Sequence, residues 1–382
     1  MYRLWTLVFL ILLIGCSRLV IKQIPAFSPL NRSIAKNNIG RTNSTNIEIT
    51  PPLSVAWNYT VSGGFGPCPA SYVEDILCVG DLNGEINLLD IKNGKSLGSK
   101  KFGSTIIGTP LIDGDNLYIA LSNDENTLIS YNLSNGSVNW KLALGEIETS
   151  PLIIGEKLYV ATLTGKLTCV DKVKGQIIWT FDPPLPQASK ICRSSPASDG
   201  NLIVYSCEGG FIYALHLSDG ELIWQTNIGG SIISSPTIYN NKMFIGSLDS
   251  SFYSFNLSTG KQIWRQSLGA SVYASQAVSD KYVYVSTVGK FLYCLSIEDG
   301  KIVWEKKMKG LILSPPLLSD KYLYVASLDS CLSVVDAGNG ESVWEFKTEA
   351  RIKSMPMIAQ GKLFVFAENR TIIALQPGGD SK

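Results

Sequence analysis

A short motif that recurs at a nearly constant interval constrains the fold of this chain more than any other feature. Glycine is followed four residues later by tryptophan in six copies, which end at Trp140, Trp179, Trp224, Trp264, Trp304 and Trp344. An earlier copy, from Gly94 to Gly98, ends in glycine, and Trp57 stands alone before it. These eight positions lie 39 to 45 residues apart. A repeat of about 40 residues with strand-like content is typical of the blades of a β-propeller.

One copy of the repeat, residues 231–264, shows how a blade is built. It contains four strand-like stretches separated by turns. The last turn, from Asn256 to Gly260, is a hairpin signal, because asparagine can cap its own backbone and glycine accepts positive φ. On the outer strand that follows, an indole can lie between adjacent blades while its N–H bonds to a backbone carbonyl. We assign this structural role to Trp57, Trp140, Trp179, Trp224, Trp264, Trp304 and Trp344.

A Ser-Pro or Thr-Pro pair recurs ahead of the motif in most copies. The pairs are Thr109-Pro110, Ser150-Pro151, Ser195-Pro196, Ser235-Pro236 and Ser314-Pro315, with variants at Cys68-Pro69 and Met355-Pro356. Because proline removes a donor from the hydrogen-bond ladder, it is tolerated mainly on edge strands. The pairs therefore predict the innermost strand of each blade, beside the central channel.

The two ends of the repeat region complement each other. Three strand-like stretches follow Trp344, at residues 352–358, 362–367 and 371–376, and the missing fourth strand is the one around Trp57. Pairing them closes the ring and removes its open sheet edges. The sequence therefore predicts an all-β chain, with an eight-bladed β-propeller of four-stranded antiparallel blades over residues 53–378.

The N-terminus has the pattern of an export signal. Arg3 precedes an apolar run of about eleven residues, which is too short for a membrane span of roughly 20 residues. The run ends in Leu-Ile-Gly-Cys16, which resembles the lipobox of bacterial lipoproteins. The resemblance implies that residues 1–15 are a signal peptide and that Cys16 carries a diacylglycerol and an acyl chain. Ser17, where aspartate would favour inner-membrane retention, indicates the outer membrane. Residues 16–52, rich in Asn, Ser, Thr and Pro, are expected to be a flexible tether.

Composition excludes several functional classes. The chain has 33 basic and 32 acidic side chains, so it has no general electrostatic attraction to nucleic acid. His216 is the single histidine, which argues against His-ligated metal sites and His-based triads. We expect no metal, no cofactor and no enzymatic activity.

The repeat resembles the pyrroloquinoline-quinone-like propeller repeat, and with the lipobox and tether it resembles the BamB family of outer-membrane assembly lipoproteins. This implies a non-catalytic scaffold on the periplasmic face of the outer membrane. Its implied partners are a periplasmic POTRA domain of a BamA-like barrel-assembly protein and unfolded outer-membrane proteins. The family's partner-binding loop corresponds to residues 182–196, in the longest interval between tryptophans. Its matching positions are Leu185, Ile191 and Arg193. The acidic residues that the family has at the start of the next blade are missing, since residues 230–234 contain no carboxylate.

Two other classes share the repeat. A quinoprotein dehydrogenase would need an aspartate base, carboxylate and amide ligands for Ca²⁺ and commonly a vicinal Cys-Cys disulfide. The chain has no Cys-Cys pair, and its adjacent acidic pair, Asp124-Glu125, lies in a turn-like stretch. A surface sensor or polymer-binding propeller lipoprotein is the other alternative, and the sequence does not exclude it.

Seven cysteines remain if Cys16 is lipidated. Cys68 and Cys78 flank one predicted turn, and Cys192 and Cys207 flank another, so hairpin register allows a cross-strand disulfide in each pair. The alternative is that all are buried free thiols. Because the count is odd, at least one thiol is unpaired in either case.

Overall fold

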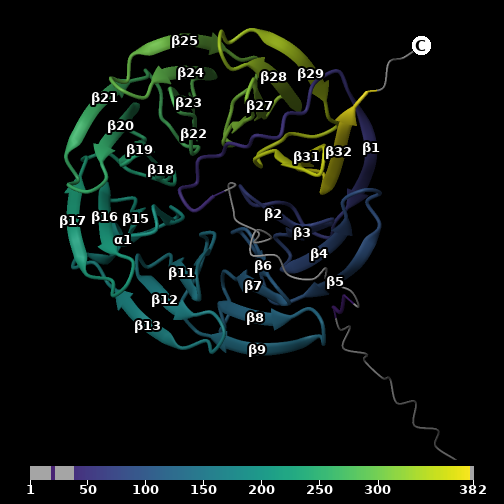
Figure 1. The fold of residues 1–382 in the computed structure, drawn as a ribbon, viewed down its shortest axis with the longest axis vertical. Coiled ribbons are helices and arrows are strands. Elements are labelled where there is room, and N and C mark those ends of the chain that lie inside the picture. The colour runs from purple at the N-terminus through teal and green to yellow at the C-terminus, as the bar shows by residue number, and fades with distance from the viewer. Residues whose placement is uncertain (1–18, 22–37, 379–382) are drawn as a thin grey trace, which may run out of the picture.

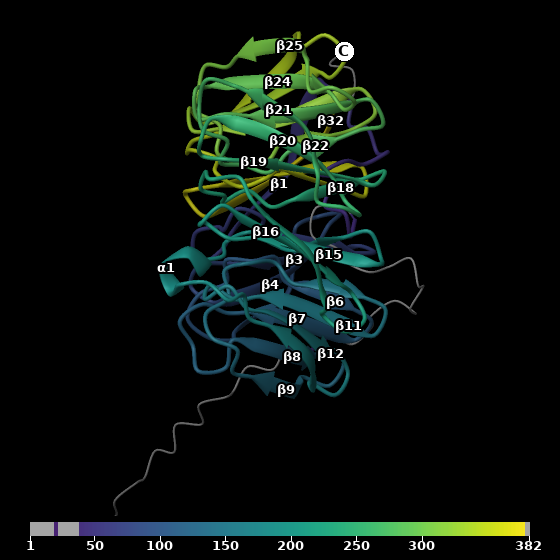
Figure 2. The same cartoon turned by 90° about the vertical axis from the view of Figure 1, so that its left-hand side faces the viewer.

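The computed structural model describes residues 19–21 and 38–378. Over residues 38–378 the chain forms a closed ring of eight four-stranded antiparallel sheets around a hub, as Figure 1 shows. Figure 2 shows the ring from its side, with the short helix α1 (Gln187–Lys190) projecting from one face. The predicted all-β, eight-bladed propeller is confirmed.

The blades are numbered in chain order, and each runs from the hub outward. Blade 1 comprises β2 (Ala70–Val73), β3 (Ile76–Gly80), β4 (Glu85–Asp90) and β5 (Ser96–Lys101). Blade 2 comprises β6 (Leu111–Asp113), β7 (Asn116–Ala120), β8 (Leu128–Asn132) and β9 (Ser137–Leu142). Blade 3 comprises β10 (Leu152–Ile154), β11 (Lys157–Ala161), β12 (Leu167–Asp171) and β13 (Ile177–Phe181). Blade 4 comprises β14 (Ala197–Ser198), β15 (Leu202–Ser206), β16 (Phe211–His216) and β17 (Leu222–Asn227).

The second half of the ring repeats this plan. Blade 5 comprises β18 (Thr237–Tyr239), β19 (Lys242–Gly246), β20 (Ser251–Asn256) and β21 (Gln262–Ser267). Blade 6 comprises β22 (Ala277–Val278), β23 (Tyr282–Ser286), β24 (Phe291–Ser296) and β25 (Ile302–Lys307). Blade 7 comprises β26 (Leu317–Leu318), β27 (Tyr322–Ser327), β28 (Cys331–Asp336) and β29 (Ser342–Lys347). Blade 8 comprises β30 (Met357–Ala359), β31 (Lys362–Ala367), β32 (Thr371–Pro377) and β1 (Leu53–Thr60).

Blade 8 closes the ring by combining both ends of the chain. Its strand order is β1-β32-β31-β30, and β1 pairs antiparallel with β32 so that Trp57 faces Ala374. The predicted closure, by the N-terminal strand around Trp57 and three C-terminal strands, is confirmed. Closure leaves the ring without an open interface between its first and last blades.

The hydrophobic core of the described residues is divided into eight clusters, each between two neighbouring blades. In β19, Met243 and Ile245 pack toward blade 4, whereas Phe244 packs toward blade 6. Successive side chains of a strand point to opposite faces of the sheet, and here a blade covers each face. The second strand of each blade is therefore apolar at most positions instead of alternating with polar residues.

The Gly-x-x-x-Trp motif is a contact between neighbouring blades. Trp224 of β17 donates a 2.7 Å hydrogen bond from Nε1 to the carbonyl of Leu257 in blade 5. The same indole lies over Gly260, where an added Cβ would come within 2.6 Å of the ring. Each such glycine thus accommodates the tryptophan of the preceding blade. The equivalent pairs are Trp57 with Gly94, Trp140 with Gly175, Trp179 with Gly220, Trp264 with Gly300, and Trp304 with Gly340.

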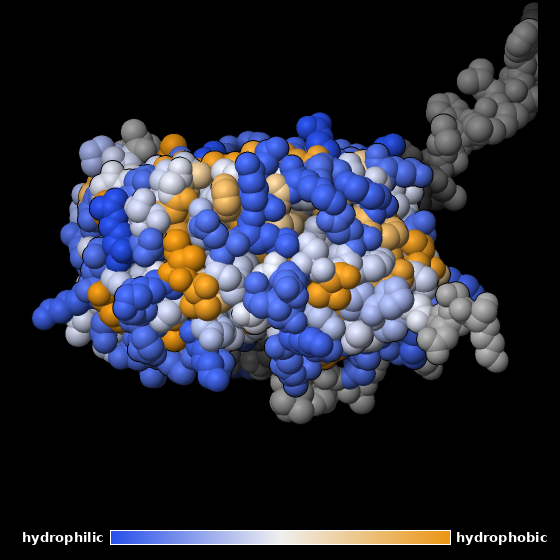
Figure 3. Space-filling view, turned by 90° about the horizontal axis from the view of Figure 1, so that it is seen from above, coloured by the Kyte–Doolittle hydropathy of each residue, from blue (hydrophilic) through white to orange (hydrophobic). Residues whose placement is uncertain are grey.

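The outer strands expose part of their aliphatic residues. Ile302 and Val303 of β25, for example, are 40% and 48% exposed. Figure 3 shows hydrophobic patches that alternate with hydrophilic ones along the edge of the ring. Single apolar side chains among charged neighbours are ordinary on a protein surface.

Residues 38–49 differ from the predicted flexible tether. This segment, purple in Figure 1, runs along the inner ends of blades 4 to 7. Its carbonyls accept hydrogen bonds from the inner edge strands, in the pairs Ser198 to Ile39, Ile238 to Gly40, Val278 to Thr42, and Leu318 to Asn43. The innermost strands have free N–H groups on their hub side, and this segment satisfies them. Residues 22–37 lie outside the described residues.

The contact between tryptophan and glycine predicts that alanine destabilises the protein more at Gly260 than at Gly361. Gly260 and Gly361 have φ values of +67° and +70°, so alanine strains both backbones by about 1–2 kcal/mol. Gly361 has no atom within 4 Å of an added Cβ, whereas Gly260 faces Trp224. Because the indole must also move, Gly260→Ala is expected to destabilise the protein by about 1–3 kcal/mol more than Gly361→Ala does. Urea unfolding of the two variants measures the difference, and equal losses would contradict the contact.

Candidate functional site

The hub is lined by a chain of hydroxyl groups that link successive blades. The backbone N–H groups of Thr109, Ser150, Ser195 and Ser235 each donate to the hydroxyl of the equivalent residue in the next blade, at 2.9–3.0 Å. The last acceptor is Ser275 of blade 6. The Ser-Pro pairs therefore stand just ahead of the inner strands, where the serine hydroxyls join blades 2 to 6. Sequence analysis recognised the prolines but missed this role of the serines.

A cavity of about 170 Å³ lies at the hub and is walled by residues from blades 1 to 7. Apolar side chains, including Ile107, Ile233 and Leu313, make up much of the wall. Its charged groups are Glu148 and Arg193, and Tyr273, which also lines it, is 43% exposed. A pocket with a mostly apolar wall and few polar groups is suited to receive part of a partner.

Arg41 occupies the hub beside the same serines. It is fully buried, and its guanidinium donates hydrogen bonds to the carbonyls of Ser150 at 2.9 Å, Pro151 at 3.3 Å and Pro196. Burial lowers the pKa of Arg41 to about 10, so the group is still a cation at neutral pH. Backbone carbonyls of two blades thus hold a cation at the centre of the ring. Sequence analysis missed Arg41 because it lies in a segment without periodicity.

The predicted docking loop connects β13 to β14 and contains α1. Arg193 is 41% exposed and forms ion pairs with two carboxylates, Glu148 at 2.8 Å and Glu208. Partial burial would lower the pKa of Arg193, but the two carboxylates outweigh this effect and raise it. The pair of carboxylates fixes the guanidinium at the edge of the cavity.

The three residues predicted to bind a partner have different surroundings. Arg193 lines the cavity. Leu185 is half-buried and packs against the core cluster between blades 3 and 4. Ile191 is also half-buried, and its carbonyl accepts a 2.7 Å hydrogen bond from the N–H of Glu208. Arg193 therefore lies at the hub, whereas Leu185 packs between blades 3 and 4.

Tyr273, Glu148 and Glu208 were not among the predicted site residues. They come from blade 6, from the stretch before β10, and from the turn after β15. No local motif links these positions to residues 182–196, so only the ring geometry brings them together. Glu148 and Tyr273 stand two residues before Ser150 and Ser275, as Arg193 stands two before Ser195, so aligning the blades on these serines could have found them. Glu208 has no such signal.

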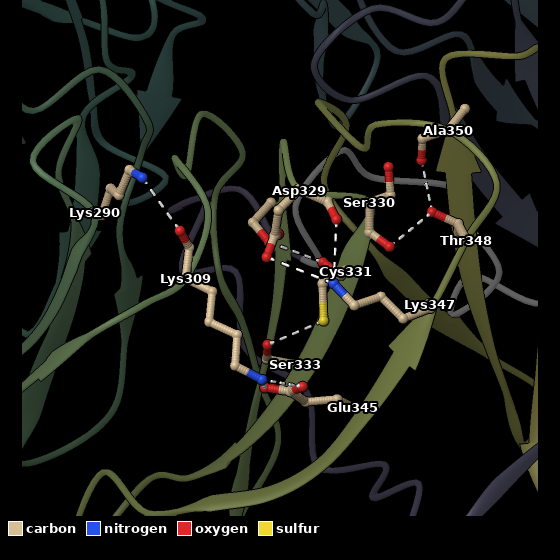
Figure 4. Close-up of polar contacts among 11 residues, drawn as sticks. Lys290, Lys309, Asp329, Ser330, Cys331, Ser333, Glu345, Lys347, Thr348 and Ala350 are labelled. Atoms are coloured by element: carbon tan, nitrogen blue, oxygen red, sulfur yellow. Dashed lines mark hydrogen bonds and ion pairs between the residues drawn. The ribbon is translucent and has the colours of Figure 1, made fainter.

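A second polar cluster joins blades 6 and 7, as Figure 4 shows. Lys309 pairs with Glu345 at 2.7 Å, and Lys290 donates to the carbonyl of Lys309 at 3.3 Å. The hydrogen bond to Glu345 raises the pKa of Lys309. Because the lysine side chain is 70% exposed, water and salt screen the pair. This cluster has the character of a solvated contact between blades.

Among residues 19–21 and 38–378, no three His, Cys, Asp or Glu side chains gather so that they could hold a metal ion. In the same residues no helix is long and apolar enough to cross a membrane. The predicted lipidation site, Cys16, lies outside the described residues, as do residues 1–15.

None of the seven cysteines of the described part forms a disulfide. Cys78 faces Ser71 across the β2–β3 hairpin, so hairpin register does not bring it opposite Cys68. Cys192 does lie beside Cys207, because the Ile191–Glu208 backbone bond aligns their segments. The hydrogen bond with Cys207 and burial raise the pKa of Cys192 well above its usual range. Neither possible disulfide is present in the structure.

Comparison with known proteins assigns the chain to a family. The family model described as "Outer membrane protein assembly factor BamB" matches residues 54–179, 82–257, 186–276 and 248–380. The chain belongs to the BamB family. The BamB protein of Burkholderia pseudomallei is 27% identical over 105 residues, which are 28% of this chain and 26% of that protein. Aligned regions span from about a quarter to about half the length of the curated BamB relatives.

Solved structures share the fold of this chain at low sequence identity. BamB from Moraxella catarrhalis has a TM-score of 0.73 and 17% identity, over 85% of this chain and 99% of that one. A europium-containing methanol dehydrogenase has a TM-score of 0.76 and 12% identity, over 87% of this chain and 88% of that one. The ring is therefore shared by assembly factors and by redox enzymes, and the site residues must distinguish them.

The burial pattern predicts that one thiol reacts first. Cys68 is half-buried and lines the hub cavity, whereas Cys78, Cys169, Cys192, Cys207, Cys294 and Cys331 are buried. Maleimide treatment of the folded protein should therefore add one label, and Cys68→Ser should abolish it. Intact mass spectrometry measures the number of labels. Fast addition of several labels would contradict the buried positions.

Proposed function

We propose that this chain is a non-catalytic scaffold lipoprotein on the periplasmic face of the outer membrane, where it supports assembly of β-barrel proteins. Membership in the BamB family supports a role in outer-membrane protein assembly. Lipidation at Cys16 and the periplasmic location rest on the sequence pattern of residues 1–17. The proposed partners are a POTRA domain of a BamA-like protein and unfolded outer-membrane proteins.

The surface around Arg193 carries this proposal. Two carboxylates hold its guanidinium at the edge of an apolar cavity, and Tyr273 is 43% exposed on the wall of the same cavity. Arginine and tyrosine are enriched among residues that dominate binding energy at protein interfaces. A guanidinium held in place loses little conformational freedom on binding. The surface is therefore preorganised to receive a protein segment.

Charge reversal at this surface tests the proposal. Arg193→Glu places a third carboxylate beside Glu148 and Glu208, and Tyr273→Ala removes the exposed ring. Each variant is expected to reduce recovery of the BamA-like protein about tenfold or more, when the lipoprotein is isolated from membranes and analysed by mass spectrometry. Arg265→Glu is the matched control, because Arg265 is also exposed and paired with one carboxylate, Asp249, but lies on the outer strand β21.

Recovery that both hub variants leave unchanged would contradict docking at the hub. Isolation of the wild-type lipoprotein without any barrel-assembly protein would contradict the proposed function as a whole. Thermal unfolding of each variant, compared with Arg265→Glu, shows whether a loss of recovery follows from a loss of folding.

The dehydrogenase alternative is disfavoured by the residues at the hub. The cavity wall includes one carboxylate, Glu148, which already pairs with Arg193. A quinone with a divalent or lanthanide ion would need several carboxylate and amide ligands there. The residues present do not fit such a group, so no catalytic step is derived. Addition of the quinone and Ca²⁺ should give no alcohol-dependent dye reduction, and a reproducible reduction would overturn the assignment.

A further inference from the structure

One contact between blades has no tryptophan on its outer strand. In five places a tryptophan of an outer strand donates its Nε1–H to the first residue after the third strand of the next blade. These acceptors are Ile91, Lys172, Leu257, Ile297 and Ala337. At the contact from blade 1 to blade 2 the tryptophan position is Gly98, and the equivalent acceptor is Leu133, directly after β8.

Residues 19–21 fill this position. The backbone N–H of Ile21 donates a 2.9 Å hydrogen bond to the carbonyl of Leu133. Leu19 is 1% exposed and packs on Gly98, where an added Cβ would come within 2.7 Å of its Cδ1. The N–H of Leu19 is bonded to the hydroxyl of Tyr131 at 3.1 Å. A leucine side chain and a backbone amide thus supply the apolar bulk and the donor that an indole supplies elsewhere.

We propose that this docked segment fixes the orientation of the ring on the membrane, with the outer edge of blades 1 and 2 facing the lipid. The inference rests on the proposed lipidation of Cys16. Leu19 is three residues from Cys16, and three extended residues span at most about 11 Å. The acyl chains at Cys16 would therefore be held close to the Leu19 contact instead of being separated from the ring by a long tether.

The charges of the neighbouring strands agree with a membrane on this side. The sequences of β5 and β9 contain Lys100, Lys101 and Lys141 and no carboxylate. On other blades, β25 has Glu305 beside Lys306 and Lys307, and β29 has Glu345 beside Lys347, so a carboxylate offsets part of the positive charge there. Lysines beside a lipid anchor are attracted to anionic phospholipid head groups, and such a second signal strengthens anchoring by acyl chains. Leu97, next to Gly98 in β5, and Val138 of β9, which pairs with Tyr131, are exposed apolar residues on these strands.

This orientation has a consequence for the proposed docking surface. If the outer edge of the ring contacts the membrane, the bilayer covers neither of the two faces of the ring. The hub cavity and Arg193 are then open to a partner that approaches along the membrane. Residues 22–37, which connect the docked segment to residues 38–49, lie outside the described residues.

Photo-crosslinking to lipid tests the orientation. A benzophenone amino acid is placed at Leu97 or at Ile263, which are 40% and 42% exposed on the outer strands of the opposite blades 1 and 5. The full-length lipoprotein is irradiated in intact membranes, and lipid adducts are measured by mass spectrometry. We expect at least fivefold more adduct from Leu97. Leu19→Asp, which puts a charge into the buried position, should bring the two yields close together.

Equal yields from Leu97 and Ile263 in the chain with unchanged Leu19, or a larger yield from Ile263, would overturn the proposed orientation. So would a mature protein whose mass shows no acyl chain on Cys16. Recovery of the barrel-assembly partner is a separate readout. If the partner is recovered but the yields are equal, only the orientation fails; if the yields differ but no partner is recovered, only the assembly role fails.

Discussion

The contact between a tryptophan of one blade and a glycine of the next is the interaction on which this ring depends. A single four-stranded blade has apolar side chains on both faces and cannot bury either of them alone. Two neighbours must cover it, and so stability is shared between blades rather than contained in them. The indole packs against the glycine of the next blade and donates a hydrogen bond to a carbonyl of that blade. Closure through Trp57 on β1 then gives the first and last blades the neighbours that an open array would lack.

The same requirement explains the two N-terminal segments. The inner strands expose N–H groups to the hub, and residues 38–49 supply carbonyls to four of them. The contact between blades 1 and 2 lacks its tryptophan, and residues 19–21 take its place. The chain that precedes the repeat therefore completes the ring at two positions, one at the hub and one on the outer edge. Function is proposed at the same two positions, with a partner at the hub and the membrane at the edge.

The fold could be predicted from the sequence because the repeat is periodic. Gly260, Trp264 and their counterparts mark six blades at the same place, Gly94 marks a seventh, and the unpaired Trp57 shows how the ring closes. The hub could be predicted only in part. Arg193 was identified, but Glu148 and Tyr273 lie in other blades and Glu208 lies in the turn after β15, so only the folded ring brings these residues to one site. The missing tryptophan at Gly98 is visible in the sequence, yet no periodic signal shows that Leu19 replaces it. Contacts made by non-repeated segments depend on the path of the chain, which composition does not reveal.

Hydrogen exchange at the amide of Ile21 tests most directly whether the chain itself completes the ring. The measurement uses the full-length lipoprotein in detergent, with peptides that separate residues 19–21 from residues 22–37. If the N–H of Ile21 is bonded to Leu133, its exchange is slowed to the range of the outer-strand amides in β5 and β9. Exchange at the rate of an unstructured peptide would show that the position at Gly98 is open and would contradict the account.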